Sequence, residues 1–157
     1  MEWSEVSGEF YCDGSWRDIY VLGTEIQHWQ RAIDQLRASS FQVRYFRAGV
    51  ECVLPARAAD AFPEPGWTDR LVSIDLGGLI ANAHFFSEKE IEFDLNPSDV
   101  RSQRELDIIV QFMHLLADAT GCETILTPEN LRQIAIFRVR PNESSIVYVP
   151  FGGFSEA

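Results

Sequence analysis

The stretch LVSIDLGGLIANAHFFSEKEIEFDL, residues 71–95, decides the fold of this chain. Gly77-Gly78 separates two runs rich in apolar residues, and such a pair is a strong signal for a two-residue β-hairpin turn. This turn would place one continuous apolar face across both strands. The pairing it predicts is Leu76 with Leu79, Ile74 with Ala81, and Val72 with Ala83.

A second turn, at residues 87–89, leads into a strand whose apolar and acidic residues alternate. A one-residue slip would move every side chain to the other face, so the strands share one core most simply if Asn82 pairs with Asp94 and His84 with Glu92. Opposed residues lie about 5 Å apart at Cβ, close enough for a hydrogen bond between His84 and a carboxylate. The polar face of this hairpin is therefore predicted to carry Asn82, His84, Glu90, Glu92 and Asp94.

An amphipathic helix is predicted over about residues 24–38. Thr24 followed by Gln27 is the pattern of a capping box. Apolar residues then recur at three- and four-residue intervals, which gives one apolar stripe for a sheet to cover. Further strands are predicted at residues 16–22, 41–47, 50–54, 123–126, 134–140 and 146–149, with a one-turn helix at Thr127-Pro128-Glu129.

A long central helix is predicted over about residues 99–120. Asn96-Pro97-Ser98 ends the preceding strand, and Gly121 stands where helices favour a left-handed cap. Its apolar residues cover most of the circumference. We therefore expect a single α+β domain, residues 1–157, with a mainly antiparallel sheet and these two helices.

Composition narrows the class of protein and its compartment. Twenty-four acidic residues against thirteen Lys and Arg give a formal charge of −11, and such a surface repels nucleic-acid backbones. No apolar run approaches the length of about 20 residues that a membrane helix needs. The first twenty residues lack the pattern of a secretory signal, and three scattered cysteines fit neither a disulfide framework nor a zinc finger. We expect a cytoplasmic protein with reduced thiols, and a homo-oligomer is possible.

The polar face of the hairpin is the candidate binding surface. A row of carboxylates on a rigid strand suits a partner rich in Lys or Arg, and Trp67, in a Pro-Gly-Trp loop, is a further candidate contact. The same residues also fit an ordinary solvated sheet face, or, through His84, an acid/base pair or half a metal site. The predicted partner-binding residues are Asn82, His84, Glu90, Glu92, Asp94 and Trp67.

Three segments resemble the small acidic immunity proteins that bacteria encode beside polymorphic or contact-dependent toxins. They are WRDIYV at residues 16–21, IEFDLNP at residues 91–97, and LTPEN at residues 126–130. The resemblance implies a cytosolic inhibitor that binds a cognate toxin, often a basic nuclease, by charge complementarity and occlusion.

Two other classes of function stay open. A small-molecule-binding domain would need an apolar pocket between the sheet and the long helix, with His114 or His84 as a polar anchor. A catalytic domain would need Cys122 or Ser98 brought beside a histidine. The usual nucleotide-binding, zincin and α/β-hydrolase motifs do not occur. The expected function is therefore binding of a basic protein, with no catalytic residue, metal or cofactor.

Overall fold

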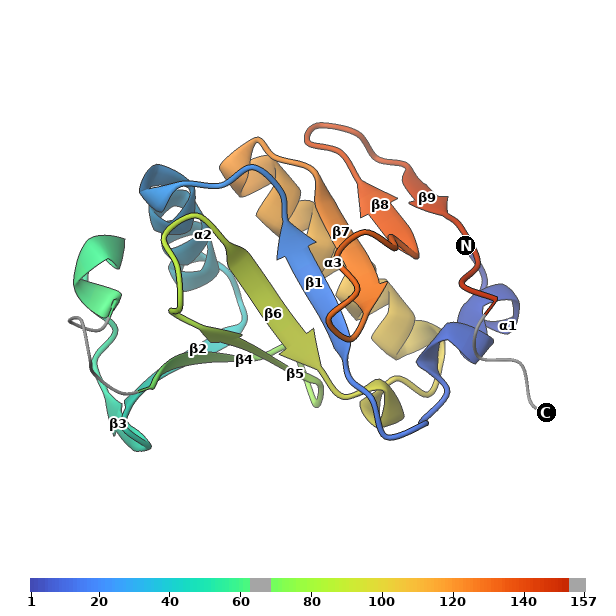
Figure 1. Cartoon of the computed structure of the whole chain (residues 1–157), viewed down its shortest axis with the longest axis horizontal. Coiled ribbons are helices and arrows are strands. Elements are labelled where there is room, and N and C mark those ends of the chain that lie inside the picture. The colour runs from blue at the N-terminus through green and yellow to red at the C-terminus, as the bar shows by residue number, and fades with distance from the viewer. Residues whose placement is uncertain (63–68, 153–157) are drawn as a thin grey trace.

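The structure is a computed structural model that describes residues 1–62 and 69–152. Within these residues, nine strands form one sheet in the order β3-β2-β4-β5-β6-β1-β7-β8-β9, and every neighbouring pair is antiparallel. Two helices, α2 (Ile26–Ala38) and α3 (Gln103–Thr120), lie together against one face of the sheet (Figure 1). The α+β class with a mainly antiparallel sheet is confirmed. The strands are β1 Arg17–Val21, β2 Gln42–Arg47, β3 Val50–Cys52, β4 Arg70–Asp75, β5 Ile80–His84, β6 Ile91–Leu95, β7 Thr124–Pro128, β8 Phe137–Val139 and β9 Ile146–Tyr148.

The meander from β4 to β6 has the predicted register. Ile74 faces Ala81 and Val72 faces Ala83, and the Leu76 N–H donates to the Leu79 carbonyl at 2.8 Å. Gly77 and Gly78 both have positive φ, the backbone region that glycine enters without a Cβ clash. On the other side, β5 pairs with β6 through Asn82 and Asp94 as expected, but this ladder ends before His84 and Glu92.

The helices differ from the sequence-based bounds at their first turns. Helix α2 spans Ile26–Ala38, and its N-cap is Glu25, whose backbone N–H donates to His28 Nδ1 at 2.9 Å, so the predicted Thr24–Gln27 box is wrong. Helix α3 spans Gln103–Thr120 and begins four residues later than predicted, because residues 97–99 form a separate 3-10 helix. Gly121 closes α3 at φ 71°, the predicted left-handed cap.

Other segments also depart from expectation. Residues 127–128 belong to β7, so the predicted one-turn helix there is wrong. A short helix, α1 (Trp3–Val6), and the 3-10 helix that follows it, Ser7–Phe10, were not predicted; Tyr148 and Phe151 hydrogen-bond to Glu9 there. Figure 1 shows these two helices near the N-terminus. A further 3-10 helix spans Ala58–Ala61. Among the described residues, no helix is long and apolar enough to cross a membrane.

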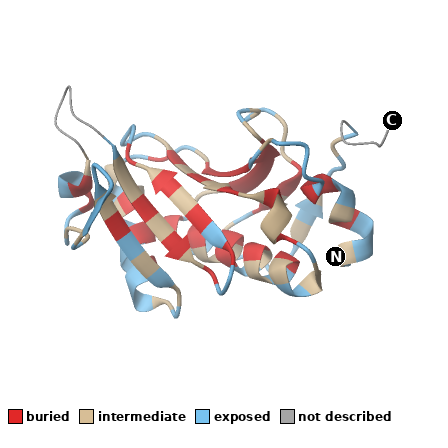
Figure 2. Ribbon diagram, turned by 90° about the horizontal axis from the view of Figure 1, so that it is seen from below, coloured by how far each residue is buried: buried red, intermediate tan, exposed pale blue. Residues whose placement is uncertain are grey.

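Strand β1 lies in the middle of the sheet, between β6 and β7. All five of its residues are buried, although three of them are polar or aromatic with a polar group. Burial alternates along β4 and β6 (Figure 2), whereas β7, like β1, is buried along its whole length. The inner face, turned toward α2 and α3, carries apolar residues such as Ile19, Phe93 and Ala83. The face opposite the helices is hereafter called the outer face, and its central part carries Asp18 and Tyr20 of β1 and the polar residues of β5 and β6.

Candidate functional site

Carboxylates gather on the outer face where β1 and β6 run side by side. In this pair Asp18 lies opposite Asp94, and Tyr20 lies opposite Glu92. Successive residues of a strand point to opposite faces, so these four side chains share the outer face while Ile19 and Phe93 point into the core. We call Asp18, Tyr20, Glu92 and Asp94 the acidic cluster.

The Tyr20 hydroxyl lies between two carboxylates of this cluster. Its oxygen is 3.4 Å from Asp18 Oδ2 and 3.2 Å from Glu92 Oε1. A phenol has one hydrogen to donate, so it can serve only one of the two carboxylates at a time. Asp18 has a second donor, the Asn130 backbone N–H at 2.7 Å.

Burial and mutual repulsion disfavour the charged forms of these carboxylates. Burial raises the pKa of Asp18, and the charge of Asp94 adds to the increase while the Asn130 hydrogen bond opposes it. Burial, then the charge of Asp18, raises the pKa of Glu92 to about 7. Burial raises the pKa of Asp94 as well, against the lowering effects of His84 and Asn82. The cluster therefore concentrates negative charge that a cation could stabilise.

Residues of the segment between β7 and β8 contact the edge of the acidic cluster. Arg132 pairs with Glu90 at 2.9 Å, and its guanidinium carbon lies 5.5 Å from the centroid of the Tyr20 ring. The Asn130 N–H bonds Asp18, as described above. A guanidinium of the chain itself thus rests where a cation would be drawn by the carboxylates, and it remains partly exposed.

The structure describes five of the six predicted site residues. Asn82 and Asp94 face each other, and Glu92 lies in the acidic cluster, so these three are brought together. Glu90 lies at the edge of the cluster through its pair with Arg132. His84 Nδ1 is 2.8 Å from Asp69 Oδ1, so the predicted cross-strand partner, Glu92, is wrong. Trp67 lies outside the described residues.

Sequence reasoning missed Asp18, Tyr20 and Arg132. Asp18 and Tyr20 alternate with Ile19 and Val21, the same period-two signal that marked β6. That signal alone could place them on one face of a strand. It could not place this strand next to β6, because the two strands are far apart in the chain.

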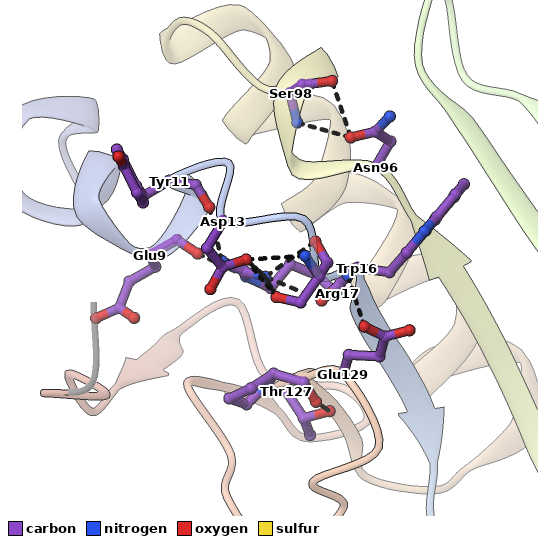
Figure 3. Close-up of polar contacts among 11 residues, drawn as sticks. Glu9, Tyr11, Asp13, Trp16, Arg17, Asn96, Ser98, Thr127 and Glu129 are labelled. Carbon is purple, nitrogen blue, oxygen red and sulfur yellow. Dashed lines mark hydrogen bonds and ion pairs between the residues drawn. The ribbon is translucent and has the colours of Figure 1, made fainter.

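Two exposed aromatic side chains are found near the acidic residues of the outer face. Phe86, 81% exposed, stacks on the His84 ring with centroids 5.0 Å apart. Trp16, 40% exposed, directly precedes β1, and its backbone N–H donates to Glu129 Oε2 at 3.1 Å (Figure 3). Carboxylates beside exposed aromatic rings are a composition that suits recognition of Arg and Lys side chains.

Arg17, next to Asp18 in the chain, contrasts with the acidic cluster. Its side chain is fully buried and points away from the outer face, into the segment formed by residues 9–16 (Figure 3). Its guanidinium donates to three backbone carbonyls within 3.0 Å, those of Glu9, Tyr11 and Trp16, and to Ser15 Oγ. Burial lowers the pKa of Arg17, but guanidinium begins from so high a value that it stays charged. We call this set the Arg17 cluster.

The residues considered for catalysis or for a ligand pocket make contacts of other kinds in the described part of the chain. Cys122 and Ser98 bond to Thr120 and Asn96, and in the described part of the chain neither bonds to a histidine. His114 lines a surface groove with Asp118 and Asn142, and His84 lies on the outer face, so neither occupies the layer between sheet and α3. Among residues 1–62 and 69–152, no three His, Cys, Asp or Glu are grouped to hold a metal ion.

Comparisons with known proteins give no relative. No family model matches the chain, and neither a curated protein nor a solved structure matches it. The outer face itself is therefore the feature from which a function can be proposed.

Proposed function

We propose that this chain is a protein-binding inhibitor of the immunity type, which holds a basic partner, such as a toxin domain, against the outer face of its sheet. The observation that carries this proposal is the acidic cluster, in which Asp18, Glu92 and Asp94 share one face of two adjacent strands. Burial raises the pKa of all three carboxylates. A Lys or Arg side chain from a partner would stabilise the ionised forms of these carboxylates. That stabilisation would contribute to the affinity.

The fixed spacing of the acidic residues and the exposed aromatic rings beside them support binding of a protein surface. The acidic residues sit on strands, which hold them at fixed spacing, and exposed aromatic rings lie at Trp16 and Phe86. A cationic protein surface can cover such a face with many contacts at once. Association of the chain with such a cationic protein would be fast at low salt and would slow as the salt concentration rises.

The experiment is co-purification of the chain with the product of the adjacent gene, followed by charge reversal on β6. Replacing Glu90, Glu92 and Asp94 by Lys is expected to abolish the complex. A second variant, Glu90→Gln, Glu92→Gln and Asp94→Asn, keeps the side-chain sizes and should fold even if the first does not. It is expected to weaken binding at least tenfold.

The control is an equal change of charge elsewhere. Asp60, Asp107 and Glu143 are exposed carboxylates on other parts of the molecule, and replacing them by Lys should leave most of the affinity intact. Unchanged binding in both β6 variants, or an equal loss in the control, would remove the outer face from the interface. Lack of any complex at moderate salt would remove the immunity function.

A further inference from the structure

Strand β3 forms one edge of the sheet, where only β2 borders it. Figure 1 shows it at one extremity of the molecule. The two strands are joined by the two-residue turn 48–49, whose residues both have positive φ, as in the type I′ turn of a β-hairpin. In such a hairpin the residues that flank the turn exchange both hydrogen bonds, and hydrogen-bonded pairs then alternate with non-hydrogen-bonded ones. Val50 and Cys52 therefore direct their backbone groups toward β2.

The backbone N–H and C=O groups of Glu51 and of Val53, the residue after β3, point away from β2 by the same alternation. Among residues 1–62 and 69–152, no strand lies on that side of β3, and no backbone hydrogen bond satisfies these groups. Many edge strands are protected by lysine or proline. Residues 50–54 contain neither, and Val50 and Val53 are 69% and 89% exposed. This edge is therefore open to pairing with another strand.

The charge near β3 favours a second copy of the chain as that partner. Two copies with a formal charge of −11 repel each other over most of their surfaces. Residues 42–53, which form β2, the turn and β3, contain Arg44 and Arg47 against one acid, Glu51. Arg44 binds the Glu51 carboxylate through Nε at 3.1 Å and through Nη2 at 2.8 Å. At this edge two copies can approach without the repulsion that their acidic surfaces would produce.

We propose that two copies of this chain associate through their β3 edges, antiparallel, with Cys52 of one copy opposite Cys52 of the other. Glu51 of each copy then faces Val53 of the other, and each of these two pairs exchanges both of its backbone hydrogen bonds. The two-fold axis runs perpendicular to the sheet, so the two sheets become continuous and both outer faces turn to the same side. Because β2, β4 and β5 separate β3 from β6, this inference does not depend on the proposed function.

This register places opposite charges near one another on the outer face. Arg44 lies one residue beyond the pair of Tyr45 with Cys52, so it stands beside Val53 on the neighbouring strand. In the pair of copies, Arg44 of one copy then shares a row with Glu51 of the other, with Val53 between them. The two Glu51 side chains are diagonal neighbours and do not oppose each other directly. Two arginines and two glutamates therefore form a neutral, alternating group.

The same register brings the two Cys52 side chains together on the inner face. They form a non-hydrogen-bonded antiparallel pair, in which Cα atoms lie ~4.5 Å apart. A disulfide needs Cα atoms about 4.4–6.8 Å apart, so Cys52 can report the pairing. An edge as short as β3 buries less than the ~1,200 Å² of most stable complexes. We therefore expect a reversible dimer whose population rises with concentration.

The first experiment compares disulfide cross-linking of two single-cysteine variants by oxidised glutathione. Cys12→Ser with Cys122→Ser keeps only Cys52, and Cys52→Ser with Cys122→Ser keeps only Cys12, which is exposed. One Cys52 thiolate attacks the glutathione disulfide and releases one glutathione thiolate, and Cys52 of the second copy then displaces the other. Two cysteine thiols become one disulfide, and one glutathione disulfide becomes two thiols. Although Cys52 is the less exposed cysteine, its dimer should form at least about tenfold faster on a non-reducing gel.

The second experiment tests the register through the charge of one exposed position. Val53→Glu would place a second acid opposite Glu51 of the other copy, whereas Val53→Lys would place a base there. Because Val53 is 89% exposed, both variants should fold. Sedimentation velocity over a range of concentrations should show only monomer for Val53→Glu and a dimer at least as strong as that of the wild type for Val53→Lys. Adding Glu51→Lys to Val53→Glu should restore the dimer.

Three outcomes would overturn the proposal. The first is equal cross-linking through Cys12 and Cys52, which would indicate random collision of the copies. The second is loss of the dimer in both Val53 variants, which would exclude this register. The third is a wild-type chain that stays monomeric at every concentration. A monomer that still binds a basic partner would leave the proposed function standing.

Discussion

Arg17 and Asp18 are neighbours in the chain, both are buried, and their surroundings are opposite in kind. Arg17 points away from the outer face, and carbonyl oxygens of residues 9–16 receive its hydrogens within 3.0 Å. Asp18 points to the outer face, where Asp94 and Glu92 lie close by and donors are few. A buried charge that is matched by its neighbours stabilises the fold, whereas one set among like charges is held in place by the rest of the structure.

The contrast between the two clusters indicates which of them a partner could stabilise. In the Arg17 cluster, hydrogen bonds from the guanidinium hold residues 9–16, a segment that has little regular structure of its own. In the acidic cluster, the pairing of β1 with β6 holds carboxylates close together although their charges repel one another. A cation from a partner would stabilise the carboxylates of the acidic cluster. It would not stabilise the Arg17 cluster.

The largest expected effect comes from breaking the Arg17 cluster. Arg17→Ala should destabilise the fold by ~3–5 kcal/mol, because it leaves buried carbonyl groups without donors and removes a large buried side chain. Urea unfolding measures this free energy. The matched control is Arg44→Ala, which breaks an exposed pair with Glu51 and should cost less than about 1 kcal/mol. Equal losses in the two variants would show that Arg17 is not a structural tie.

An intermediate effect is expected when the charge of the acidic cluster is reduced. The unfolded chain loses the Glu92 proton near pH ~4.3, whereas the folded state keeps it up to about pH 7. Between these values the folded state binds more protons, so its stability is greatest below the lower value and is lost as pH rises through the upper one. Because Glu92 is partly exposed, this loss should be on the order of 1–2 kcal/mol.

Glu92→Gln should remove that part of the pH dependence. The variant should be more stable than the wild type at pH 8 by about the same amount, on the order of 1–2 kcal/mol. Urea unfolding at pH 5 and pH 8 measures both values. A wild type whose stability rises over this range, with the variant following in parallel, would contradict the expected role of Glu92.

The smallest effect should come from removing one hydroxyl. Tyr20→Phe keeps the ring beneath Arg132 and deletes the hydrogen bonds to Asp18 and Glu92. We expect a loss of ~1 kcal/mol at pH 8, where both carboxylates need a donor. Tyr11→Phe, at a residue that is 52% exposed, should stay within ~0.5 kcal/mol of the wild type. A Tyr20→Phe variant as stable as this control would show that the hydroxyl is not shared.

Local patterns predicted the parts of this structure that depend on local pairing. The turn at Gly77-Gly78 sets the register of β4 and β5, and the alternation in β6 separates Glu92 and Asp94 from the core. The place of β1 depends on pairing with β6 and β7, to which no turn connects it. Asp18 and Tyr20 were missed for that reason.

The predicted first residue of α3 was wrong because the sequence contains two signals for the start of a helix. Pro97 opens a 3-10 helix, and Ser102, whose side chain accepts the Arg104 N–H, is the N-cap of α3. Both residues are strong start signals in sequence, and only the packing of the chain decides between them. His84 pairs with Asp69, which lies just before β4 and within reach of the His84 ring on the outer face.

The central place of β1 also affects how the chain acquires its structure. During synthesis β1 emerges before β6 and β7, and at roughly 5–20 residues per second it waits several seconds for both neighbours. Over that interval the meander from β2 to β6 can form by itself, with the edge of β6 unpaired. Insertion of β1 then completes the sheet through contacts that are distant in sequence, which makes it the expected slow step of folding.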